Sequence, residues 1–108
     1  YPQNCQNYPR MRIYPKHYEN IEYVKLNFGE RVIRHLLTEL SKRNIQSVIV
    51  EGGKELLNSF IKEGSWDEAR VLVGQDPFME GIAAPSLSNS PYNTMDAGGD
   101  KVLLYKNY

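Results

Sequence analysis

Apolar residues recur at helical spacing in two stretches of the chain. Within residues 31–42 they are Val32, Ile33, Leu36, Leu37 and Leu40, and within residues 53–63 they are Leu56, Leu57, Phe60 and Ile61. Steps of three and four residues place side chains on one face of a helix, which then packs against another layer. Asn44 and Gly64 follow these stretches and are typical helix-ending residues. The pattern predicts two amphipathic helices, over residues 31–42 and 53–63.

Three other stretches have the composition of strands. Residues 21–28 carry apolar side chains at alternate positions from Val24, and residues 68–73 form a short apolar strand pattern. Residues 47–50 are apolar without full alternation, which is typical of a strand covered on both faces. Because strands and helices alternate along the chain, we expect parallel pairing with right-handed crossovers.

The last third of the chain predicts a loop followed by a hairpin. Residues 75–91 are rich in Gly, Pro and Ser, and residues 92–96 and 101–106 are candidate strands joined by two glycines. The predicted fold class is therefore α/β, a mixed sheet flanked by helices, over residues 21–108. Residues 1–20 contain Tyr-Pro three times and few aliphatic residues, which predicts an irregular connector or a peptide-binding arm.

Composition narrows the possible partners. Thirteen basic and thirteen acidic residues give no net charge, which argues against a nucleic-acid partner. No apolar run reaches the length of a membrane span. Cys5 is the single cysteine and favours a reducing compartment such as the cytoplasm. His17 and His35 lie far apart and outside any metal-ligand motif, so we expect no metal site.

The junction between residues 48–50 and the second helix is the candidate site. Glu51, Gly52 and Gly53 stand between an apolar strand pattern and a helix pattern. Glycines let a ligand approach the backbone, and the free N–H groups of a first helical turn bind anions such as a pyrophosphate. Glu51 stands where a carboxylate accepts hydrogen bonds from sugar hydroxyls, or where it stabilises the helix start. The alternative is that the glycine pair only makes a tight turn.

Two further features accompany this junction. Lys54 either adds a positive charge beside a phosphate or points to solvent, and Trp66 anchors the joint between helix and strand. A loop of small residues beginning at Gly81 follows the third predicted strand, at the sheet end where ligands bind in open α/β sheets. No residue identifies itself as catalytic from the sequence.

The residues together resemble the reductase domain of the bifunctional pyrimidine deaminase/reductase of riboflavin biosynthesis. The resemblance begins at Ile45-Gln46-Ser47-Val48-Ile49-Val50-Glu51-Gly52-Gly53 and continues at Leu56-Leu57-Asn58-Ser59-Phe60. It extends to Trp66-Asp67-Glu68-Ala69-Arg70-Val71 and resumes at Gly81 with Ala84-Pro85-Ser86-Leu87. It covers about residues 30 to 106 and implies a dihydrofolate-reductase-like fold.

The resemblance implies an activity and a set of site residues. The family uses NADPH to reduce 5-amino-6-(5-phosphoribosylamino)uracil to its ribitylamino form, in an enzyme that is often multifunctional. By position, Glu51 resembles a substrate-contacting glutamate. The implied cofactor-binding residues are Gly52, Gly53, Lys54, Glu55, Leu56, Leu57, Asn58, Ser59 and Gly81.

The chain also departs from the family pattern. Lys54 replaces a small residue, and the first half of the reductase domain, with its substrate-binding aspartate and arginines, has no counterpart. The chain therefore resembles the C-terminal half of the domain, and we expect it to be inactive alone and to form a homo-oligomer through its uncovered surfaces. Two other functions stay open: another dihydrofolate-reductase-like NADPH reductase, or a non-catalytic α/β interaction module.

Overall fold

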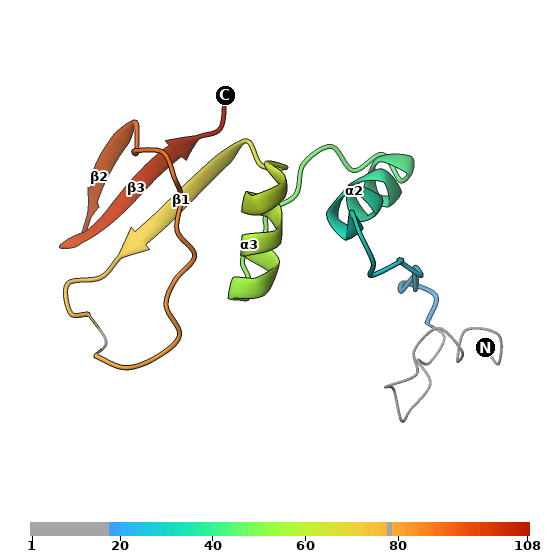
Figure 1. The fold of residues 1–108 in the computed structure, drawn as a ribbon, viewed down its shortest axis with the longest axis horizontal. Coiled ribbons are helices and arrows are strands. Elements are labelled where there is room, and N and C mark those ends of the chain that lie inside the picture. Colours follow the sequence, from blue (N-terminus) through green and yellow to red (C-terminus); the bar gives the residue numbers. More distant parts are fainter. Residues whose placement is uncertain (1–17, 78) are drawn as a thin grey trace.

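The computed structural model describes residues 18–77 and 79–108. Within these residues, the helices α2 (Val32–Lys42) and α3 (Lys54–Glu63) precede three strands. The strands are β1 (Glu68–Val73), β2 (Asn93–Ala97) and β3 (Asp100–Lys106). Figure 1 shows the sheet at one end, α3 beside it, and α2 on the far side of α3. The predicted connector, Cys5 and His17 lie outside the described residues, apart from residues 18–20.

Both predicted helices are confirmed, and their ends have a local cause. After α2, Asn44 adopts a positive φ of 60°, and the N–H of Ile45 donates to the carbonyl of Leu40 at 3.1 Å. After α3, Gly64 has φ 72°, and the N–H of Ser65 donates to the carbonyl of Phe60 at 3.1 Å. A left-handed residue followed by such a bond satisfies carbonyls that the helix leaves free.

The predicted strand at residues 68–73 and the C-terminal hairpin are also confirmed. The sheet has the order β1-β3-β2, and both pairs of neighbours are antiparallel. Gly98 and Gly99 connect β2 to β3 with φ values of 63° and 96°. A two-residue hairpin turn with two positive φ angles matches the twist of the strands, and glycine adopts it without a steric penalty.

The predicted strands at residues 21–28 and 47–50 are wrong for this structure, and so is the parallel pairing. Within the described residues, the first segment makes one isolated bridge, between Tyr18 and Ile21, and the second makes none. A strand exists through hydrogen bonds to a neighbouring strand, and a suitable side-chain pattern does not supply that neighbour. Among the described residues, the helices therefore alternate with irregular segments, and the sheet consists of β1 and the hairpin.

The described residues bury few apolar side chains. Ile33 on α2 and Phe60 on α3 are 3% and 6% exposed, and no other hydrophobic residue in residues 18–77 and 79–108 is buried. Ile49 is 87% exposed and Leu72 on β1 is 77% exposed. The radius of gyration is 17.8 Å, whereas a compact domain of this length has about 13 Å. The chain therefore has the elements of a domain without a closed core.

An ion-pair cluster fastens the segment before α2 to that helix. The guanidinium of Arg43 donates from Nε to Glu22 at 3.1 Å and from Nη1 to a carboxylate oxygen of Glu39 at 2.7 Å. These hydrogen bonds hold the pKa of Glu22 and the pKa of Glu39 below their ordinary values. Both carboxylates are therefore charged at neutral pH. Arg43 connects the segment around Glu22, which pairs with no strand among the described residues, to α2.

Candidate functional site

The start of α3 presents unused backbone donors. Gly53 precedes the helix in an extended conformation, and no side chain caps the helix start. The helical hydrogen bonds begin where the N–H of Leu57 donates to the carbonyl of Gly53 at 3.1 Å. The N–H groups of Lys54, Glu55 and Leu56 therefore come before the first helical bond. Such groups, with the positive end of the helix dipole, form a ready site for an anion.

The two glycines before the helix serve different purposes. Gly52 has φ 135°, which side-chain-bearing residues rarely adopt, and its peptide bond to Gly53 is cis. Gly53 has an ordinary extended backbone, with φ −76° and ψ −164°, and no atom lies within 4 Å of a Cβ built on it. Gly52 is thus required by the turn, whereas Gly53 leaves open space beside the helix start.

The polar residues of this junction are accessible. Glu51 is exposed, and among the described residues no hydrogen bond or ion pair involves its carboxylate. Lys54 is half-buried and likewise makes no ion pair with the described residues. One acidic and one basic residue therefore stand beside the free N–H groups in the sequence, and neither is ion-paired with a described residue.

The other predicted site residues of α3 differ in exposure and in hydrogen bonding. Glu55 and Leu56 are exposed, and Leu57 and Asn58 are half-buried. The hydroxyl of Ser59 donates to the carbonyl of Glu55 at 2.8 Å, so it bonds within its own helix. The Ser59 hydroxyl is therefore already bonded, whereas the N–H groups of the first turn precede the first helical hydrogen bond.

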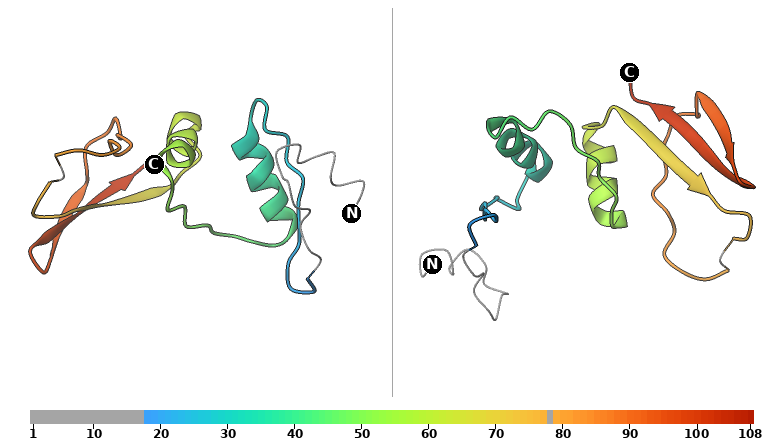
Figure 2. Two further views of the ribbon diagram at one scale, coloured as in Figure 1. Left: turned by 90° about the horizontal axis from the view of Figure 1, so that it is seen from below. Right: turned by 180° about the vertical axis from the view of Figure 1, so that it is seen from behind.

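The loop after β1 lies on the same side of the molecule as the helix start. Figure 1 shows the amino-terminal end of α3 and this loop together at the lower side of the view, and the rear view in Figure 2 agrees. Gly81 belongs to the loop, is exposed, and has φ 140° with open space around it. The loop of small residues and the start of α3 thus lie on one side of the molecule, and the role of Gly81 in a shared site stays a prediction.

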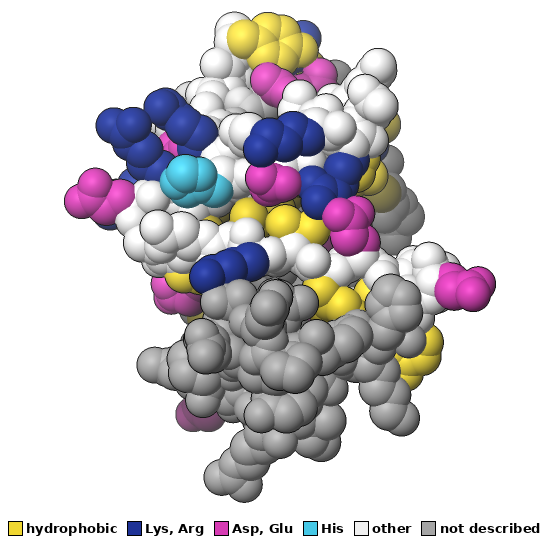
Figure 3. Space-filling view, turned by 90° about the vertical axis from the view of Figure 1, so that its right-hand side faces the viewer, with side chains coloured by type: hydrophobic (Ala, Val, Ile, Leu, Met, Phe, Trp, Pro, Cys, Tyr) yellow, Lys and Arg dark blue, Asp and Glu magenta, His cyan; other side chains and the backbone are white. Residues whose placement is uncertain are grey.

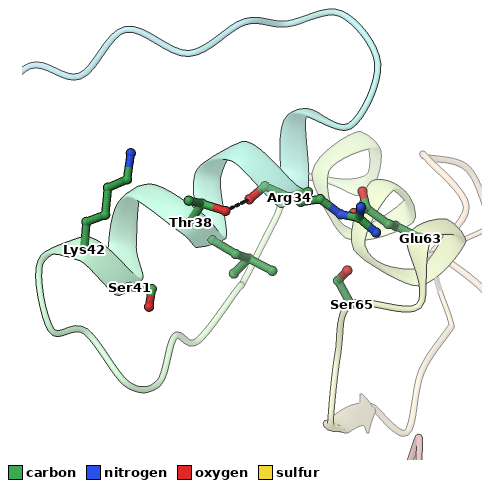
Figure 4. Close-up of a pocket in the computed structure, with 7 residues that line it drawn as sticks. Arg34, Thr38, Ser41, Lys42, Glu63 and Ser65 are labelled. Atoms are coloured by element: carbon green, nitrogen blue, oxygen red, sulfur yellow. Dashed lines mark hydrogen bonds between the residues drawn. The ribbon is translucent and has the colours of Figure 1, made fainter.

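A separate hollow of about 500 Å³ lies between α2 and the end of α3 (Figure 4). Its lining residues are Arg34, Leu37, Thr38, Ser41, Lys42, Glu63 and Ser65. The hydroxyl of Thr38 donates to the carbonyl of Arg34 at 2.8 Å. The sequence analysis did not identify this hollow, although polar residues on α2 recur there at steps of three and four. It lies at the opposite end of α3 from the glycines.

Charges of both signs cover the α2 side of the molecule. Figure 3 shows Lys and Arg side chains interspersed with Asp and Glu side chains, with apolar atoms visible between them. In residues 18–77 and 79–108, no three His, Cys, Asp or Glu side chains gather in an arrangement that would hold a metal ion. Within the same residues, no helix has both the length and the apolar character needed to cross a membrane.

Comparison with known proteins identifies the class of this chain. The family profile described as the RibD C-terminal domain matches residues 9–91. The chain therefore belongs to the RibD C-terminal domain family. Within the described residues, the two helices and the three-stranded sheet agree with a partial domain of the dihydrofolate-reductase-like α/β type.

A particular relative agrees with this family. The chain is 27% identical, over 120 aligned positions, to the riboflavin biosynthesis protein RibD of Aquifex aeolicus (strain VF5). The alignment covers 97% of this chain and 34% of that protein, so the chain spans about a third of the relative's length. No solved structure matches the chain.

Proposed function

We propose that this chain is part of an NADPH-dependent reductase of riboflavin biosynthesis. Its substrate is 5-amino-6-(5-phosphoribosylamino)uracil and its product is the ribitylamino form. The observation that carries the proposal is the start of α3, where free N–H groups and open space at Gly53 follow the exposed residue Glu51. That arrangement occurs in a chain of the RibD C-terminal domain family.

The residues at the helix start fit the cofactor. The N–H groups of Lys54, Glu55 and Leu56 would hold the pyrophosphate, with the Lys54 ammonium beside it. Residues Leu57, Asn58 and Ser59 complete the predicted cofactor-binding stretch, and the loop at Gly81 would line the same site from the sheet side. We assign Glu51 to the substrate, as an acceptor for its hydroxyl or amine groups.

The reaction determines what the protein has to provide. Converting a ribosyl into a ribityl group adds two hydrogens, one as a hydride from the nicotinamide and one as a proton. The hydride chemistry belongs to the cofactor, and the protein binds and orients the two reactants. A carboxylate such as Glu51 orients a polyhydroxylated substrate because a charged acceptor makes stronger hydrogen bonds than a neutral one.

Replacing Glu51 by Gln in the protein that contains this chain tests the proposed substrate role. We expect the KM for the pyrimidine to rise about 10- to 100-fold, because losing hydrogen bonds to a charged group costs about 1.5 to 3 kcal/mol. NADPH affinity should stay unchanged. The measurement is NADPH oxidation followed at 340 nm against pyrimidine concentration, with NADPH affinity determined by calorimetry.

Glu55→Gln is the matched control for that variant. It removes the same charge from the exposed first turn of α3 and keeps the Glu55 backbone N–H, which is the group assigned to the cofactor. Equal effects of the two variants would point to the general field of the helix and contradict the assignment of Glu51. Absence of NADPH oxidation by the parent protein with this pyrimidine would refute the proposed reaction itself. A related reductase with a different substrate would then be the next hypothesis.

We further propose that the isolated chain associates with itself. Ile49, Leu72 and Ile82 are each more than three-quarters exposed, and exposed apolar surface favours association. We expect multi-angle light scattering of the purified chain to give a mass of at least two copies. A single monodisperse species of 12.5 kDa at high concentration would contradict this proposal.

The isolated chain should show no turnover, because the other parts of the reductase are absent from it.

A further inference from the structure

A residue at the end of the chain is bonded to the turn that follows α3. The side-chain amide of Asn107 donates to the carbonyl of Gly64 at 3.1 Å and to the carbonyl of Trp66 at 2.8 Å. Its backbone N–H donates to the carbonyl of Asp67 at 2.9 Å. Among the described residues, these are the hydrogen bonds that connect residues 64–67 with β3 and the residues after it.

The Asn107 backbone is held independently of its side chain. On one side, the carbonyl of Lys106 accepts from the Asn89 amide at 2.9 Å, and the Lys106 ammonium lies 4.5 Å from the centre of the Tyr92 ring. On the other side, the Tyr108 hydroxyl donates to Glu68 at 3.0 Å. Deleting the Asn107 amide therefore leaves the end of the chain in place.

Among the described residues, no Cα of α3 lies within 8 Å of a Cα in β1, β2 or β3, so backbone packing does not set the angle between α3 and the sheet. A hollow of about 340 Å³ lies at this joint, and its walls include Ile61, Trp66 and Leu87. The side chains that line this hollow lack packing contacts across it. The left-hand view in Figure 2 shows the C-terminus beside α3, at the joint where the helix meets the sheet. Hydrogen bonds across the joint therefore carry more of the positioning than they would in a filled core.

We propose that Asn107 is a positioning residue for the cofactor site: by fixing the turn after α3, it sets where the opposite end of that helix lies. The proposal rests on the proposed NADPH-binding role of the helix start. Ten helical residues span about 15 Å, so a rotation of about 10° at the joint moves the first turn by about 2.6 Å. Such a displacement exceeds the tolerance of a hydrogen bond.

The first test is the NADPH affinity of Asn107→Ala in the protein that contains this chain. We expect the Kd to rise at least about tenfold, since misplacing binding groups by about 1 Å already has large effects. Asn89→Ala is the matched control. It removes an amide hydrogen bond from the same end of the chain, while the bond from the Asn107 N–H to Asp67 remains, and its Kd should stay within about twofold of the parent. An Asn107→Ala affinity equal to that of the control would overturn the proposal.

The second test does not depend on NADPH. Spin labels at Glu55→Cys and Asp96→Cys, in a Cys5→Ser background, report the distance between the first turn of α3 and the hairpin. We expect a broader or shifted distance distribution in Asn107→Ala and an unchanged one in Asn89→Ala. An unchanged distribution in Asn107→Ala overturns the proposal. If the parent protein does not bind NADPH but Asn107→Ala still broadens the distance distribution, the proposed function is refuted. The role of Asn107 in positioning α3 is then supported.

A second variant tests the proposal if Asn107→Ala does not fold. If Asn107→Ala does not fold, Asn107→Gln keeps the amide on a stem one methylene longer, which misplaces it relative to Gly64 and Trp66. A folded Gln variant with weaker NADPH binding and a broader distance distribution supports the proposal, and one matching the parent overturns it. Failure of both variants to fold would assign Asn107 to folding rather than to positioning and would also overturn it.

Discussion

Replacing Gly53 by Asp is expected to abolish NADPH binding, with a rise in Kd of at least about 100-fold, equivalent to about 2.7 kcal/mol. The Gly53 backbone has φ −76° and open surroundings, so an aspartate is accommodated without strain or clash. Its carboxylate would lie where we place the pyrophosphate, and it would also accept hydrogen bonds from the free N–H groups of the first turn. Like-charge repulsion and competition for the same N–H donors both weaken NADPH binding.

Calorimetric titration with NADPH measures this effect, and Asn93→Asp is its control. In the parent, Asn93 Oδ1 accepts a hydrogen bond from the N–H of Thr94 at 2.8 Å, and an aspartate keeps that bond while adding one negative charge on β2. We expect the control to bind NADPH like the parent. Gly53→Ala adds bulk without charge and should weaken binding less than Asp does. Unchanged affinity in Gly53→Asp would show that the start of α3 is a turn and not an anion site.

Truncating Phe60 to Ala is expected to lower the free energy of unfolding by about 3 to 4 kcal/mol. Phe60 is 6% exposed, and it is one of two buried hydrophobic residues in the part of the chain that the structure describes. Removing its ring takes away buried apolar area and leaves a cavity. Because the core has so few other members, little remains to fill the space. Domains are stable by only about 5 to 15 kcal/mol in total, so we expect a large part of the stability to be lost.

Phe28→Ala is the same chemical change at an exposed position. Phe28 is 81% exposed, and we expect its truncation to change stability by no more than about 0.5 kcal/mol. Urea unfolding of both variants, followed by circular dichroism at 222 nm, gives the comparison. Equal losses in the two variants would mean that Phe28 is covered in solution, for instance by a second copy of the chain. A negligible loss in Phe60→Ala would contradict the burial of Phe60 described above.

The sequence by itself determined the elements that depend on local signals. The spacing of apolar residues predicted both helices, and Asn44 and Gly64 predicted where they end. The strand at residues 68–73 and the two-glycine hairpin were predicted to within a residue or two. The glycines before α3 were also visible in the sequence. Gly52 adopts φ 135°, which favours glycine, and Gly53 places no side chain beside the first turn.

The tertiary structure decided the features that depend on contacts between residues far apart in the sequence. Residues 21–28 and 47–50 have strand patterns, yet no neighbouring strand pairs with them among the described residues, and the pairing that exists is antiparallel. The hollow between α2 and α3 and the bonds from Asn107 to residues 64–66 join segments that no sequence pattern connects. Periodicity specifies which face of an element is apolar, whereas hydrogen bonds and packing between elements depend on which surfaces meet in space.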